Sequence, residues 1–338
     1  MKQLTTLLML FLATVLFAQD PAIANKLSVG GTVDAYYQTN LTSTDKANPI
    51  FNGGDGGAQS FGTSFANQTG FGLGMANIIV SYKGEKTGAV SDLAFGTRGL
   101  QAVGADTDVF INQLYAYWEV SKKTTLTLGR FNTYLGYEVI SPSGNFNYST
   151  SYLFSSGPFS HVGLKADFAL TQDFSLMLAI MNPTDVNNDL VGGYAIGAQL
   201  GYAGHFLNFY YDDDEVLGFE VDYTGGIDVF DKFYLGINAG YSDNAGSGFY
   251  GVALYPQLAT SDNFSIGLRG EYFNWKTDGA LDEPHVFSIT LTGSYTVENL
   301  IIKPELRLDS NSEKVYFDSD LMPVNSFAAL TLAAIYMF

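Results

Sequence analysis

Residues 302–309 read IKPELRLD and separate apolar from charged side chains with a period of two. One face of the extended chain would carry Lys303, Glu305, Arg307 and Asp309. The other face would carry Ile302, Pro304, Leu306 and Leu308. Successive side chains of a β-strand point to opposite sides. The stretch therefore predicts a strand that is apolar on one side and faces water on the other.

The same alternation recurs along most of the chain. It is clear in residues 161–168, 233–241, 264–272 and 286–295. We expect sixteen strands, at residues 27–39, 70–83, 88–98, 109–120, 124–131, 158–170, 173–182, 190–203, 205–211, 216–229, 232–243, 248–260, 263–275, 284–296, 299–309 and 326–338. The last strand is less regular, because its second face, from Ala329 to Met337, is also largely apolar.

The connections between these strands alternate in length. Tight turns such as Ser121–Lys123, Ala203–Gly204 and Val297–Glu298 fall at one end, and we expect every connection at the other end to be longer. The longest are residues 40–69, 99–108, 132–157 and 310–325. Outer-membrane barrels have short periplasmic turns, long outer loops and an even number of strands. The pattern predicts an all-β protein, a closed antiparallel transmembrane barrel in the bacterial outer membrane.

The first residues are typical of a secretory signal. Lys2 precedes a largely apolar run from Leu4 to Phe17, which is too short to span a membrane as a helix. We expect cleavage of residues 1–19, with a cut after Ala24 as the alternative, and a single barrel domain over residues 20–338. The chain has no cysteine, and its formal net charge of −18 argues against nucleic-acid binding. No cofactor, metal site or catalytic residue is predicted.

Five short motifs stand out: Gly30–Tyr37 (GGTVDAYY), Gly129–Phe131 (GRF), Gly136–Glu138 (GYE), Asn145–Tyr152 (NFNYSTSY) and Pro158–Gly163 (PFSHVG). Together they resemble the OmpL-like β-barrel porins of Bacteroidetes-type outer membranes. The resemblance implies an outer-membrane porin, that is, a water-filled channel for passive diffusion of small hydrophilic solutes. It identifies no particular solute.

Residues 132–157 form the third long loop, the place where general porins fold a constriction loop into the channel. Glu138 is the only charged residue in this loop. The candidate constriction residues are Tyr134, Tyr137, Glu138, Asn145, Asn147, Tyr148 and Tyr152. Such side chains can stack on neutral polar solutes and bond to them. The alternative is a loop that packs outside the barrel.

The alternation also assigns charged side chains to the lumen. The candidates are Asp34, Arg98, Glu119, Lys165, Asp167, Glu220, Asp222, Arg269, Glu271, Lys303, Glu305 and Arg307, together with Lys83, Asp92 and Asp309. Acidic residues moderately outnumber basic ones in this set, whereas a ring of one sign would select ions strongly. We therefore expect a weak preference for cations.

Two other functions compete with a pore. A non-conducting structural or adhesion barrel has the same architecture, because a fold alone does not establish function. An outer-membrane hydrolase would need a base such as His161, but Ser160 and His161 should lie on opposite faces of their strand. The expected partners are membrane lipid, lipopolysaccharide and small hydrophilic solutes. Analogy with 16-strand porins suggests a homotrimer, which the sequence does not establish.

Overall fold

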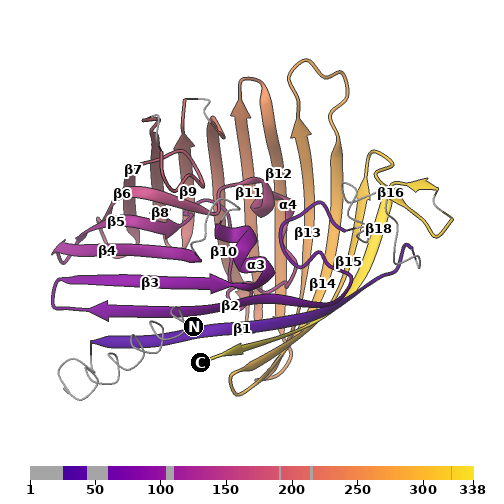
Figure 1. Ribbon diagram of the computed structural model, residues 1–338, viewed down its shortest axis with the longest axis horizontal. Coiled ribbons are helices and arrows are strands. Elements are labelled where there is room, and N and C mark those ends of the chain that lie inside the picture. The colour runs from indigo at the N-terminus through magenta and orange to yellow at the C-terminus, as the bar shows by residue number, and fades with distance from the viewer. Residues whose placement is uncertain (1–25, 44–59, 104–109, 190–191, 214–215, 321) are drawn as a thin grey trace, which may run out of the picture.

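The protein forms a closed antiparallel barrel of sixteen strands (Figure 1). The computed structural model describes residues 26–43, 60–103, 110–189, 192–213, 216–320 and 322–338. The barrel strands are β1 (Leu27–Asn40), β2 (Gly70–Lys83), β3 (Thr87–Phe95), β4 (Ile111–Ser121), β5 (Thr124–Asn132), β6 (Ser160–Ala169), β7 (Phe174–Met181), β8 (Ala195–Tyr202), β9 (His205–Tyr211), β10 (Phe219–Phe230), β11 (Phe233–Asn244), β12 (Ser247–Ala259), β13 (Phe264–Lys276), β14 (His285–Val297), β15 (Leu300–Asn311) and β18 (Ser326–Met337). The predicted fold class is confirmed. The predicted signal, residues 1–19, lies outside the described residues and stays a prediction.

The ring closes because the first and last barrel strands pair with each other. β1 pairs with β18 through partners such as Tyr36 and Ala333, and every other barrel strand pairs with its neighbours in the chain. Closure leaves no open sheet edge, so the backbone groups of the wall are bonded within it. Among the described residues, no helix is long and apolar enough to cross a membrane.

The period of two separates the two faces of the wall as predicted. In β15, Lys303, Glu305 and Arg307 are buried inside, while Leu306 and Leu308 are exposed on the outside. The outer face carries the apolar row that lipid requires.

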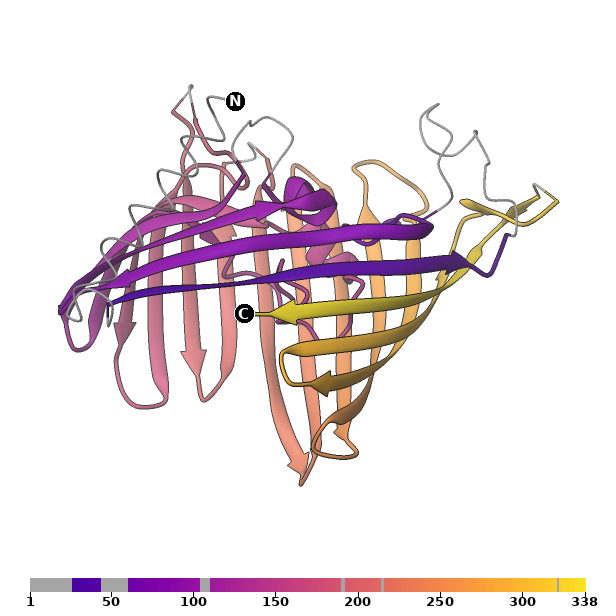
Figure 2. The same ribbon diagram turned by 60° about the horizontal axis from the view of Figure 1, so that its bottom comes forward.

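The two ends of the barrel differ in their connections, with one exception to the predicted pattern. The N-terminal end of β1 and the C-terminal end of β18 lie at the end with the tight turns (Figure 2), which is the periplasmic end of such barrels. At the outer end, β11 and β12 are joined by a two-residue turn instead of a longer loop. Ala245 and Gly246 both have positive φ, 49° and 91°, as a tight hairpin turn requires.

A second correction concerns residues 96–98, which were predicted as the end of a strand. The strand stops at Phe95, and Gly96, with φ of 88°, begins helix α3 (Gly96–Val103). Arg98 therefore projects from a helix and not from the wall. A short helix, α4 (Tyr152–Ser156), ends the third long loop, and a small hairpin of β16 (Tyr316–Phe317) and β17 (Pro323–Val324) lies in the last long loop.

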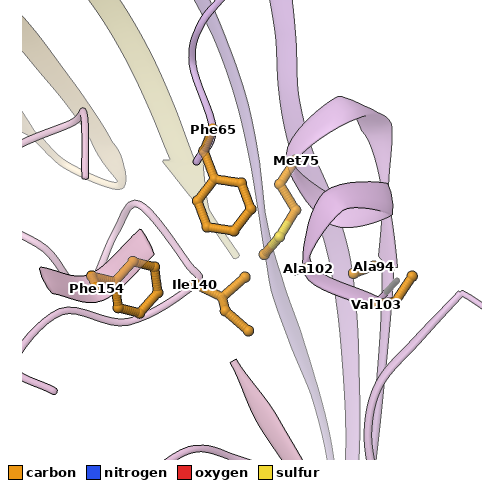
Figure 3. Close-up of a cluster of buried hydrophobic side chains, with 7 residues drawn as sticks. All are labelled: Phe65, Met75, Ala94, Ala102, Val103, Ile140 and Phe154. Atoms are coloured by element: carbon orange, nitrogen blue, oxygen red, sulfur yellow. The ribbon is translucent and has the colours of Figure 1, made fainter. Parts of the chain in front are cut away.

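An apolar cluster lies inside the barrel, where a simple water-filled pore would have none. It consists of Phe65, Met75, Ala94, Ala102, Val103, Ile140 and Phe154. Figure 3 shows Phe65, Met75, Ile140 and Phe154 converging from the first loop, β2, the third loop and α4, beside α3. The outer loops are thus anchored to one side of the lumen by hydrophobic burial.

The exposed apolar wall makes a clear stability prediction. Leu291 lies near the middle of β14 and faces outward, so Leu291→Arg should cost about 2–4 kcal/mol of folding free energy in a bilayer. Urea unfolding in lipid vesicles would measure this loss. Ser294→Arg, which places the same charge on the inner face of β14, is the matched control and should cost much less. Equal losses would contradict the assignment of the two faces.

Candidate functional site

The loop between β5 and β6 lies inside the barrel, and its backbone is bonded to the wall by two buried carboxylates. Glu305 of β15 accepts hydrogen bonds from the backbone N–H groups of Tyr148 (2.7 Å) and Ser149 (3.0 Å). Glu271 of β13 accepts from those of Tyr152 (2.9 Å) and Leu153 (2.8 Å). Each carboxylate thus satisfies two successive loop donors that burial would otherwise leave unpaired.

Three basic side chains of the same wall bond the loop as donors. Arg269 forms an ion pair with Glu138 at 2.7 Å and also donates to the Ser149 carbonyl at 2.6 Å. Lys303 donates to the carbonyls of Pro142 (2.9 Å) and Asn145. Arg307 donates to the Thr150 carbonyl at 2.8 Å and pairs with Asp309 of its own strand. The charges of β13 and β15 therefore form a docking surface for this loop.

The loop tyrosines reach the wall through their hydroxyl groups. Tyr148 donates to Asp34 at 2.5 Å and Tyr152 to Asp309 at 2.7 Å. Tyr134 donates to the Phe209 carbonyl at 2.7 Å. Burial raises the pKa of the Tyr148 hydroxyl, the nearby Arg98 opposes this rise and Asp34 adds to it. The Tyr148 phenol therefore stays protonated and acts as a donor at neutral pH.

Two asparagines and one arginine hold the middle of the loop. Asn145 bonds both the N–H (2.8 Å) and the C=O (2.6 Å) of Val139, and Asn147 donates to Thr292 of β14 at 2.7 Å. Arg98 of α3 donates to the carbonyls of Ile140 (3.2 Å) and Tyr148 (2.9 Å). Arg98 thus contacts the loop from a helix and not from a wall strand.

The remaining predicted lumen charges do not touch the middle of the loop. Glu119 and Lys165 line a separate cavity of about 340 Å³ beside β4, β5 and β6, and Lys165 pairs with Asp167 at 2.9 Å. Asp222 of β10 accepts from the Gly136 N–H at 3.2 Å, near the start of the loop. Glu220 lies two residues before Asp222 on the same face of β10. It is buried, and its Oε2 atom has no hydrogen-bond partner among the described residues.

A larger cavity lies on the periplasmic side of the loop. This vestibule has a volume of about 610 Å³ and lies between residues 137–147 and the inner faces of β11, β12, β14 and β15. Tyr137 and Tyr255 line it side by side and stack on each other, with ring centroids 4.3 Å apart. Candidate constriction residues Tyr137, Glu138, Asn145 and Asn147 line this space, whereas Tyr134, Tyr148 and Tyr152 do not line it.

The groups considered for hydrolysis are not arranged as a triad. The Ser160 hydroxyl donates to Asp185 at 3.0 Å, and the His161 Nε2 atom lies 3.0 Å from the Thr133 hydroxyl. The serine hydroxyl is thus bonded to a carboxylate and not to the imidazole. Nucleophilic catalysis by serine needs a base within hydrogen-bond reach of the hydroxyl.

The sequence did not reveal that residues 60–69 of the first loop pack on the inner face of β18. Phe61 packs against Phe327 of β18 in a buried cluster that also holds Ala329, and Ala66 and Tyr148 share a second buried cluster with Ala333. These contacts explain the apolar second face of the last strand, because loop residues and not water cover it. That apolar inner face was the one signal in the sequence that could have revealed the covering.

Fold and lumen together define the class of protein: a 16-stranded bacterial outer-membrane barrel of the porin type, with outer loops folded into its interior. The family model described as beta-barrel porin-2, OmpL-like, matches residues 26–338. The chain belongs to this family, which confirms the predicted resemblance and the outer-membrane location. No curated protein matches the chain.

Solved porin structures share the fold at low sequence identity. An anion-selective porin from Comamonas acidovorans is 12% identical, with a TM-score of 0.58, over 92% of this chain and 99% of that chain. A loop-deletion mutant of OmpT, an outer membrane protein of Vibrio cholerae, is 10% identical, with a TM-score of 0.57, over 92% of this chain and 99% of that chain. A mutant of the Rh. blastica porin is 12% identical, with a TM-score of 0.52, over 92% of this chain and 100% of that chain. These likenesses show the fold alone.

Proposed function

We propose that the protein is a passive diffusion channel for small hydrophilic solutes, narrowed by residues 132–157. The observation that carries this proposal is the bonding of the loop backbone to Glu271 and Glu305 inside a barrel of sixteen strands. A barrel of this size is wide enough for an aqueous lumen, so the loop determines how much of it stays open. Ion conductance of the purified protein in planar bilayers tests the proposal, and a folded barrel that passes no current would contradict it.

A weak preference for cations forms part of the proposal. The basic side chains Arg269, Lys303 and Arg307 are bonded to loop carbonyls, and two of them are also paired with carboxylates. Glu119, which lines the cavity beside β4, β5 and β6, forms no ion pair within the described part of the chain. The lumen therefore keeps negative charge that is not compensated locally, which favours cations.

The substitution Glu119→Gln should bring the ion selectivity close to neutral. Under a KCl gradient, we expect a reversal potential with the sign of K⁺ preference in the wild type and a value near zero in the variant. Glu313→Gln, which removes an exposed carboxylate from the last outer loop, should leave the potential unchanged. Firm anion selectivity of the wild type would contradict the proposed preference.

A non-conducting barrel is the second candidate, and the apolar cluster inside the lumen favours it. Phe65, Ile140 and Phe154 occupy interior space that water fills in a wide pore. Swelling of proteoliposomes in a graded series of sugars separates the two functions. A diffusion channel gives swelling rates that fall with solute size, whereas a blocked barrel gives none.

A further inference from the structure

The vestibule on the periplasmic side of the loop has the size of a ligand site. Its volume of about 610 Å³ lies within the range of about 300–1,000 Å³ that small-molecule sites occupy. Tyr234, Gln257, Ser294 and Lys303 line it from near the periplasmic ends of their strands. The site therefore opens toward the periplasm.

The aromatic rings that line the vestibule are held in place by their surroundings. Tyr137 stacks on the buried Tyr255 with an interplanar angle of 23°, and the half-buried Tyr234 has its hydroxyl 3.5 Å from that of Tyr137. A Cβ atom on Gly236 would overlap the Tyr137 hydroxyl, so glycine at this wall position leaves room for the hydroxyl end of the ring against β11. Rings that are already fixed lose little entropy when a ligand stacks on them.

The charged side chains that line the vestibule are already bonded to the loop or to the wall. Glu138 is paired with Arg269 at 2.7 Å, and Lys303 donates to the carbonyls of Pro142 and Asn145. A phosphorylated, acidic or basic solute would need a free counter-charge, because burying an unpaired charge is costly. The half-buried Gln257 amide and Ser294 hydroxyl face the same space and can bond to neutral hydroxyl groups.

We propose that this vestibule is a saccharide-binding site, in which Tyr137 and Tyr234 stack on the sugar rings and Gln257 and Ser294 bond to the sugar hydroxyls. The inference deepens the proposed channel function, on which it rests, by naming neutral sugars as a solute class that the pore retains. A sugar presents both an apolar ring face and many hydroxyl groups, which is the combination that the vestibule offers. Binding there places the solute directly against residues 137–147.

Two measurements test the site. The first is the block of KCl current in planar bilayers by maltotriose, compared with an uncharged polyethylene glycol of the same hydrodynamic size. The second is calorimetric titration of maltotriose into the detergent-solubilised barrel, which needs no conductance. Because Tyr137 belongs to the loop, Tyr234→Ala and Gln257→Ala provide changes on the wall strands that leave the loop sequence intact.

We expect maltotriose to block at lower concentration than the polymer, and Tyr137→Ala or Tyr234→Ala to weaken both block and calorimetric binding about tenfold. Tyr117→Ala removes a ring that lines the other cavity, beside β4, and should change neither. Equal block by sugar and polymer, or no calorimetric binding by the wild type, would overturn the saccharide site. A wild type that binds maltotriose but carries no current would overturn the channel instead and leave the binding site standing.

Discussion

Deletion of residues 134–155 should raise the single-channel conductance several-fold. The deletion removes the segment whose backbone is bonded to Glu271, Glu305 and Arg307 across the lumen. It also exposes these side chains to water, which converts a filled part of the barrel into polar channel wall. Single-channel recording in KCl measures the change, and the larger lumen should also admit larger sugars in the swelling assay.

A matched control deletes residues 279–282, from the outer loop between β13 and β14. These residues are largely exposed, so their loss should leave the conductance unchanged. A control that opens the pore as much as the test deletion would point to a general loosening of the barrel. A deletion of residues 134–155 that leaves the current unchanged would show that this loop does not limit conductance.

The wall of the barrel could be predicted from the sequence because its constraint is local. Lipid on one side and polar surroundings on the other impose a period of two within each strand, and β2 and β9 have the predicted bounds. The errors fall where this local constraint ends. At Gly96 the backbone takes a positive φ and turns into α3, although Arg98 continues the alternation of the strand.

The interior could not be predicted to the same degree, because its contacts join segments far apart in the chain. Tyr148 and Glu305 are 157 residues apart, and Arg269 and Glu138 are 131 apart. The loop itself has no periodicity that indicates its docking surface. The alternation placed Glu271, Arg269 and Glu305 in the lumen, but it gave no reason to expect that they would bind backbone groups and not solutes.

The second large effect is expected at the ion pair between Arg269 and Glu138. Both side chains are almost fully buried, at 0% and 4% exposure, so Arg269→Met leaves the Glu138 carboxylate buried without its counter-charge. Loss of one partner of a buried pair costs about 3–5 kcal/mol. The loop should relieve part of this cost by leaving the wall, which would appear as lower stability in urea and stronger open-channel current noise.

A double-mutant cycle separates the ion pair from the other bonds of Arg269. That side chain also donates to the carbonyls of Ser149 and Thr150, so Arg269→Met alone removes more than the pair. Adding Glu138→Gln to Arg269→Met removes the unpaired charge and should recover about 1–3 kcal/mol of the loss. Lys276→Met breaks a half-buried pair with Asp243 at the outer rim, away from the loop, and should change stability and noise less than Arg269→Met does. The contrary outcome is that the two single losses of folding free energy simply add up in the double variant. In that case Arg269 holds the loop through its carbonyl bonds, and the charge of Glu138 contributes nothing to docking.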